Sequence, residues 1–290
     1  MIFIIAFFAF SGPLHAEPLD PAKINEILHA TGISVNGQYK ATFPQKDIGV
    51  TVDGFSIVPA MGLTSWAVLA PRKKGVMFMG DFVVLEDEAA LVQRTAVENG
   101  LKITAMHNHF LRDIPKVMYM HLGGMGNAED MARSVAAVLE RIAGLRAAKG
   151  LKPGSPPAES GLDQRALEAI LGGGATSANG AVKFVIDRPD VNLTEMGMPV
   201  TSFMGFNTWL AFEGTMEKAA VAGDFAMRQD EVERVIAALL YHKIEVTAVH
   251  NHMVKEEPRI VFLHFWATGP ATTLARGLKA ALDETRRKRR

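Results

Sequence analysis

Six of the nine histidines in this chain fall into one pattern that occurs twice. The tripeptide His-Asn-His occupies residues 107–109 and again residues 250–252, and a further histidine follows each copy, at positions 121 and 264. Neutral imidazole is a common ligand of zinc, copper, iron and nickel. Three imidazoles on one ion leave a fourth position open, where a bound water becomes acidic enough for hydrolysis.

The spacing within each pattern predicts a shared face. Residues two apart on a β-strand project from the same side, so His107 and His109 should point together. Pairing Ala105 with His121 on the next strand would put His121 diagonally beside His107. A slip of one residue, which pairs Thr104 with His121, would send His121 to the opposite face. Both registers are compatible with the sequence.

Two aspartates are the best carboxylate candidates. Asp81 and Asp224 each follow a glycine inside an apolar run, where the backbone can approach another group closely. Each could be a fourth ligand, or could orient a histidine from behind. The candidate ligands are therefore His107, His109, His121 and Asp81 in the first half, and His250, His252, His264 and Asp224 in the second.

The repeated pattern belongs to a longer duplication. The two His-Asn-His copies are 143 residues apart (250 − 107), and no gap is needed at this offset from Asp20 to Leu139. Residues 17–145 therefore predict a first lobe and residues 162–290 a second, joined by a linker at 146–161 that is rich in Pro, Gly and Ser. Pairs at the same offset include Asn36 and Asn179, Lys40 and Lys183, Trp66 and Trp209, and Pro115 and Pro258.

Interleaved strand and helix signals predict an α+β fold. Each lobe should contain an antiparallel sheet covered by helices, and the lobes should pack about a pseudo-twofold axis, as homodimers do. In the first lobe we expect helices at 21–30, 86–99 and 128–142, and strands at 49–59, 65–70, 75–85, 101–109 and 116–122.

Composition narrows the function classes. Lys+Arg and Asp+Glu are both 31, so the net charge is zero and no nucleic-acid partner is expected. The sequence contains no cysteine, which excludes disulfides, thiolate metal sites and a cysteine nucleophile. The literal tripeptide His-Asn-His is also not the signature of HNH nucleases, whose three residues are spread along a longer motif.

The N-terminus predicts export. Residues 1–10 are almost wholly apolar and Ala16 offers a small residue before a cleavage point, so residues 1–16 are interpreted as a signal peptide. An apolar run of this length is too short to span a bilayer. We therefore expect a periplasmic or secreted protein with no integral membrane segment after cleavage.

Several segments resemble the LppY/LpqO family of exported bacterial proteins. They are GDFVVLEDE, ITAMHNHF and VMYMHLGG in the first half and VTAVHNHMVKEEPRIVFLHFWATG in the second. The resemblance covers nearly the whole mature chain and implies an envelope or secreted location. It implies no activity, because the function of that family is unknown, and no catalytic residue can be carried over.

Three interpretations of the histidines stay open. The first is a transition-metal site, with zinc as the first candidate and copper as the second, and with metal-dependent hydrolysis as its extension. The second is a metal-free module that binds a small polar or anionic envelope ligand, and the third is a purely structural role. The chain's status as an enzyme and its oligomeric state are left open. Met77 and Met79 are expected in the core. Arg112-Asp113 and Lys255-Glu256 are expected in the hairpin turns, where they form surface ion pairs or gate a pocket beside the histidines.

Overall fold

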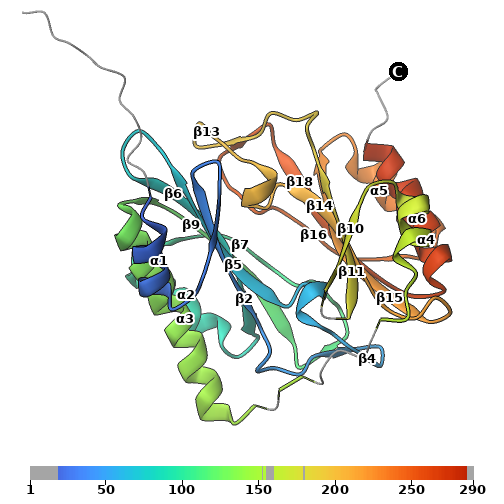
Figure 1. Ribbon diagram of the computed structural model, residues 1–290, viewed down its shortest axis with the longest axis horizontal. Helices are drawn as coiled ribbons and strands as arrows, with labels where there is room; N and C mark the ends of the chain where they lie inside the picture. Colours follow the sequence, from blue (N-terminus) through green and yellow to red (C-terminus); the bar gives the residue numbers. More distant parts are fainter. Residues whose placement is uncertain (1–18, 152, 155–159, 179, 286–290) are drawn as a thin grey trace, which may run out of the picture.

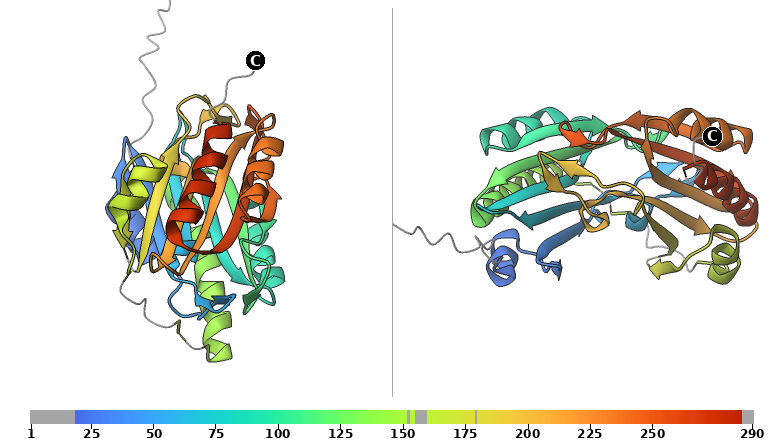
Figure 2. Two further views of the ribbon diagram at one scale, coloured as in Figure 1. Left: turned by 90° about the vertical axis from the view of Figure 1, so that its right-hand side faces the viewer. Right: turned by 90° about the horizontal axis from the view of Figure 1, so that it is seen from above.

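The computed structural model describes residues 19–151, 153–154, 160–178 and 180–285, so the predicted signal peptide at 1–16 lies outside the described residues. The chain forms two lobes that face each other through their sheets, and the helices lie on the outer sides (Figures 1 and 2). Each lobe has one six-stranded antiparallel sheet, which confirms the predicted α+β class and the duplication.

The first lobe has a main sheet of order β1-β2-β5-β6-β9-β7 and a small sheet of order β4-β3-β8. Its elements are α1 (Pro21–Leu28), β1 (Ile33–Val35), β2 (Gln38–Pro44), β3 (Thr51–Val52), β4 (Phe55–Ser56), the 3₁₀ helix η1 (Pro59–Met61), β5 (Thr64–Pro71), β6 (Val76–Leu85), α2 (Ala89–Glu98), β7 (Lys102–His107), β8 (Asp113–Ile114), β9 (Val117–Gly126) and α3 (Ala128–Lys149).

The second lobe repeats this order, with a main sheet β10-β11-β14-β15-β18-β16 and a small sheet β13-β12-β17. Its elements are α4 (Gln164–Leu171), β10 (Ala175–Ala178), β11 (Ala181–Asp187), β12 (Thr194–Glu195), β13 (Met198–Pro199), η2 (Ser202–Met204), β14 (Asn207–Gly214), β15 (Ala219–Arg228), α5 (Val232–Tyr241), β16 (Glu245–His250), β17 (Glu256–Glu257), β18 (Ile260–Gly269) and α6 (Ala271–Thr285).

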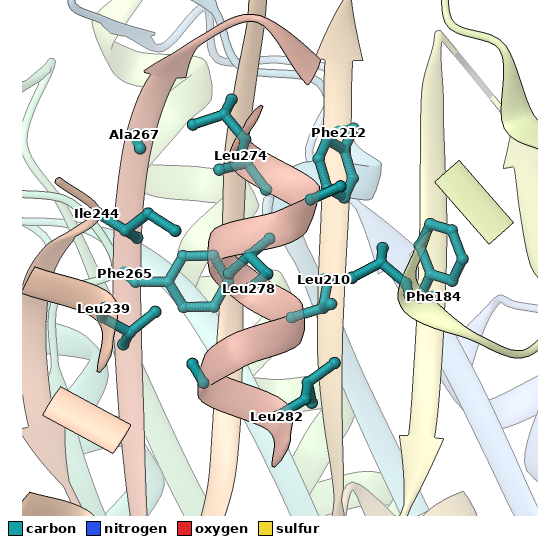
Figure 3. Packing of buried hydrophobic residues seen from close by; sticks show 14 of the residues in the cluster. Phe184, Leu210, Phe212, Leu239, Ile244, Phe265, Ala267, Leu274, Leu278 and Leu282 are labelled. Atoms are coloured by element: carbon teal, nitrogen blue, oxygen red, sulfur yellow. The ribbon is translucent and has the colours of Figure 1, made fainter. Parts of the chain in front are cut away.

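The central strands show why the lobes pair. Every residue of β6 is buried, and so is every residue of β15 except the last. A strand that is apolar on both faces needs cover on both. Helices cover the outer face, as Figure 3 shows for the second lobe, where Leu278 of α6 packs over Leu210 and Phe265 of the sheet. The inner face is covered by the other lobe.

Each lobe sends an arm across to the inner face of its partner. The first arm, residues 48–63, packs on small residues of the second sheet such as Ala211 and Ala222. The second arm, residues 191–206, packs on Val68 and Met79 of the first sheet. This reciprocal exchange makes two apolar clusters between the lobes, which bury most of both inner faces.

Several details differ from the sequence prediction, and among them β9 continues to Gly126 instead of ending at 122. Residues 49–59 form a short hairpin and the start of η1 rather than one strand, because Asp53-Gly54 adopts positive φ and turns the chain back. The final helix of the first lobe continues to Lys149 instead of ending at 142. Strands β1 and β2 were not predicted: β1 is exposed throughout, whereas the burial of β2 alternates and its sequence pattern was overlooked.

Candidate metal centre

The structure decides the register that the sequence left open. Strand β7 pairs with β9 so that Ala105 lies opposite His121 and His107 lies opposite Tyr119. A β-bulge between Ile103 and Ala105 leaves Thr104 unpaired in this ladder. The second lobe repeats the pairing, with Ala248 opposite His264. His121 therefore shares a face with His107, and His264 with His250.

The two histidine sets meet in one cluster between the lobes. The ring of His107 stacks on that of His250 with centroids 3.7 Å apart. The rings of His121 and His252 lie 3.9 Å apart, and those of His109 and His264 lie 3.8 Å apart. Each of these pairs joins the first lobe to the second. All six predicted histidines therefore lie in one cluster, although His109 and Asp81 belong to none of the groups whose ligand atoms lie close enough together to hold an ion.

Backbone and side-chain hydrogen bonds tie the two lobes together around this cluster. Thr104 Oγ1 donates to the carbonyl of His252 at 2.7 Å, and Thr247 Oγ1 donates to the carbonyl of His109 at 2.6 Å. The asparagine of each tripeptide donates across the interface as well, from Asn108 to Thr247 O and from Asn251 to Thr104 O. The two bulges point these threonines at the opposite lobe.

The predicted carboxylates lie against the cluster. Asp224 Oδ2 is 3.4 Å from His252 Nε2 and 3.9 Å from His264 Nε2, and Asp224 Oδ1 is 3.9 Å from His250 Nε2. Asp81 Oδ1 is 3.8 Å from His121 Nε2. None of these contacts forms a hydrogen bond. Each acid lies opposite its lobe's third histidine in the sheet.

Burial keeps the imidazoles neutral. It lowers the pKa of His107 to about 4. It also lowers the pKa of the other five well below the ordinary value, assisted by repulsion between neighbouring rings. A neutral imidazole keeps a lone pair for a metal. Burial raises the pKa of Asp81 to about 7 and that of Asp224 well above its usual range, so a nearby cation would favour their charged forms.

Several ligand atoms in the cluster lack partners. Among the described residues, Nε2 of His250, His252 and His264, Nδ1 of His109 and Oδ1 of Asp81 are buried without a hydrogen bond. Buried polar atoms without partners are rare and costly. Nε2 of His107 and Nε2 of His121 are 3.0 Å apart. Two nitrogens on one tetrahedral zinc ion are roughly 3.3 Å apart, which is close to the spacing of this pair, and the unpartnered nitrogens around it fit further ligand positions.

The groups that could hold an ion overlap. Three groups have ligand atoms that all lie within 4.8 Å of one another: His107, His121 and His252; His107, His250 and His264; and Asp224, His250 and His252. The first two groups combine residues of both lobes and share His107. The overlap favours one shared ion over three separate ones.

The comparisons with known proteins agree with the duplication. Residues 22–141 and 165–284 each match the model of a family described as a domain of unknown function (DUF1259). This chain belongs to the DUF1259 family. The finer resemblance to LppY/LpqO stays a prediction. None of the curated proteins matches the sequence.

Two solved structures are distantly similar to this DUF1259 chain. EtuB from Clostridium kluyveri is 8% identical, with 88% of this chain and 90% of that chain covered and a TM-score of 0.21. The double-ringed trimeric shell protein MSM0271 of the RMM microcompartment is 9% identical, with 84% and 96% covered and a TM-score of 0.19. At these TM-scores neither structure informs the fold or the function of this chain.

Sequence reasoning missed the residues that hold the two DUF1259 copies together. Thr104 and Thr247 recur at the 143-residue offset directly before the histidines, which was the available signal. Gly62 was also missed. At its φ of +107° an added Cβ would lie 2.8 Å from Nδ1 of His109, so a side chain there would displace the ring. Within the described part of the chain, no helix is long and apolar enough to cross a membrane.

Proposed function

We propose that this DUF1259 protein binds one transition metal ion between its lobes, with zinc as the first candidate and copper as the second. The observation that carries the proposal is the set of buried, unpartnered Nε2 atoms on His250, His252 and His264, facing His107 from the other lobe. Imidazole suits both metals, and the carboxylate of Asp224 would offset part of the ion's charge.

The site also suits hydrolysis as the activity. A zinc ion there would act as a Lewis acid and would lower the pKa of a water bound to it. The protein's own contribution would be to orient the ligands and to exclude bulk water. The threonine and asparagine bonds across the interface fix the backbone of both tripeptides.

The metal-free alternative is less well supported. A pocket for a polar or anionic ligand would require the histidines to act as hydrogen-bond donors. Burial holds all six neutral, so each ring could donate at most one hydrogen bond. The Nδ1 atoms of His107 and His250 already lie near the carbonyls of Asn108 and Asn251, and that of His264 lies 2.8 Å from Gly223 O. Their Nε2 atoms are then acceptors, which suits a cation.

Metal content measured by mass spectrometry tests the proposal. Untagged protein purified without chelator should hold about one equivalent of a single transition metal, as a shared centre requires. The double variant H107A/H250A should lose it while keeping the far-ultraviolet circular dichroism of the wild type. The matched control is H29N/H242N, which removes two histidines outside the cluster and should keep the metal. No uptake of zinc or copper by the wild type would overturn the proposal, and two equivalents would overturn the shared centre.

We also propose that the mature chain acts in the periplasm or outside the cell. The support is the apolar run at residues 1–10 followed by Ala16. Fractionation of cells that express the chain with and without residues 1–16 would test this. Retention of both forms in the cytoplasm would contradict it.

A further inference from the structure

A pocket of about 240 Å³ opens beside the histidine cluster on one side of the contact between the lobes. His121 and His252 form part of its wall, so the pocket and the cluster are contiguous. The wall is mainly apolar, and six methionines contribute to it: Met77, Met79, Met125, Met196, Met204 and Met253. Methionine side chains are flexible and polarisable, and they adapt to varied apolar ligands.

The pseudo-equivalent place on the other side of the contact is filled by Trp266. This residue is 2% exposed, and its ring packs edge-on against Phe110 and Phe55. Trp266 corresponds to Gly123 at the 143-residue offset, and Phe110 corresponds to Met253. We call the two places the filled side and the open pocket.

The strand registers show that this difference is local. Trp266 lies opposite Ala222 on the neighbouring strand, whereas Gly123 lies opposite Met79. The backbones therefore pair in the same way, and only the side chains differ. An added Cβ at Gly123 would approach no atom closer than 3.4 Å, so the backbone does not require glycine there. The absence of a side chain at Gly123 leaves the space of the open pocket.

The charges around the two places differ as well. On the filled side Arg112 pairs with Asp53 and Glu245, and Asp53 also accepts a hydrogen bond from Trp266 Nε1. At the open pocket these positions are occupied by Lys255, Met196 and Lys102, respectively.

Both lysines of the open pocket are exposed and line it, and no ion pair joins them to another described residue. Glu195, the carboxylate among the lining residues, accepts a hydrogen bond from the backbone of Lys255 at 3.1 Å. The open pocket therefore combines an apolar wall with two cations.

We propose that the open pocket binds a small molecule with an apolar body and a carboxylate group. The body lies among the methionines next to His121 and His252, and the carboxylate lies at Lys102 and Lys255. This ligand class is the substrate class of the proposed metal centre, so any reaction of the ligand rests on that proposed function. Binding of the ligand itself requires no metal. The filled side provides no second site, because Trp266 occupies it and acids surround it.

Calorimetric titration of the full mature chain with octanoate and with octan-1-ol tests the inference. The metal-free protein should bind about one equivalent of octanoate, at least about tenfold more tightly than the uncharged alcohol. No octanoate binding, equal affinity for the alcohol, or two equivalents would overturn it. Octanoate binding without any metal uptake would overturn the metal centre alone. Metal uptake without octanoate binding would overturn this inference alone.

Variants localise the binding. G123W should abolish octanoate binding and keep metal uptake, because the indole would occupy the space that Trp266 fills opposite. M253F introduces the phenylalanine of the filled side and should weaken octanoate binding about tenfold, which provides a second test if G123W fails to fold.

K102Q/K255Q should weaken octanoate binding but not octanol binding, whereas the matched control K73Q/K74Q in the β5–β6 turn should change neither. Unchanged octanoate affinity in both M253F and K102Q/K255Q would overturn the assigned pocket.

Discussion

The two sides of the contact between the lobes began as copies and now differ in how they are filled and in the charges around them. On the filled side, Trp266, Phe110 and an Arg112–Asp53–Glu245 network close the interface. The open pocket has glycine, methionine and lysine at the corresponding positions. Both lobes keep the three histidines, the threonine at the bulge and the aspartate. The contrast indicates that closure by one side is enough to hold the lobes, which leaves the other side available for a ligand.

The largest expected effect comes from opening the filled side. W266G removes a fully buried indole and its hydrogen bond to Asp53. We expect the free energy of unfolding to fall by about 5 kcal/mol, from the cavity and from glycine in a strand. Denaturant unfolding followed by fluorescence and circular dichroism measures the change. W266F, which keeps an aromatic ring but loses the hydrogen bond, should cost only about 1–2 kcal/mol.

The same variant tests the role of charge. W266G opens space beside Asp53 and Glu245, so it should not create a second octanoate site. A W266G protein as stable as the wild type would show that the filled side is not what holds the lobes together.

A smaller effect is expected from a buried ion pair that the lobes build differently. Glu88 and Glu231 are equivalent and fully buried at the starts of α2 and α5. Glu88 pairs with Arg146 from the end of α3, whereas Glu231 pairs with Arg188. The equivalent of Arg188 is Gln45, whose side chain already accepts a hydrogen bond from Arg146. The same acid is therefore neutralised from two different positions in the chain.

We expect R146M to lower the free energy of unfolding by about 3 kcal/mol, because it leaves the buried Glu88 with a partly exposed lysine, Lys149, in place of its buried arginine. The added substitution Q45R should recover at least half of the loss by supplying the arginine as the second lobe does. R133M on the exposed face of α3 is the control and should cost under about 1 kcal/mol. A failure of Q45R to recover stability would mean that the two arrangements are not interchangeable.

The smallest effect is expected at the threonines that join the lobes. T104V and T247V each remove one hydrogen bond across the contact and should cost about 1 kcal/mol in unfolding. Both should also weaken metal affinity, because the carbonyls that they hold belong to His252 and His109. T194V, whose hydroxyl makes only a 3.4 Å contact within its own lobe, is the control for both measurements. Metal affinity that falls in T194V but is unchanged in T104V and T247V would exclude the proposed role of Thr104 and Thr247 in positioning the histidines.

Much of the fold could be predicted because the sequence pattern of each helix and strand occurs twice, once in each copy of the duplication. The helix at α1 follows from Asp20, whose carboxylate accepts from Ala22 and Lys23 backbone groups, and from Pro21 at the first position. The strands β5, β6, β7 and β9 follow from their apolar runs and the turn residues between them, whereas the two-residue strand β8 was not predicted. The inserted hairpin at Asp53-Gly54 was overlooked, although that dipeptide is a turn signal.

The sequence by itself determined which residues could bind a metal and that they occur in pairs. The six histidines and two aspartates stood out by type, spacing and repetition. The divergence of Trp266 from Gly123 was also visible at the same offset, but nothing in the sequence said that the two positions face equivalent spaces.

Only the tertiary structure decided that the two sets form one centre and that one of the two spaces is open. Each tripeptide lies on the inner face of its sheet, where covering by the other lobe is what buries it. Strand periodicity states which residues share a face, but it does not state what covers that face. The β-bulges at Thr104 and Thr247 then set the register, because a single unpaired residue shifts every later pairing in the strand.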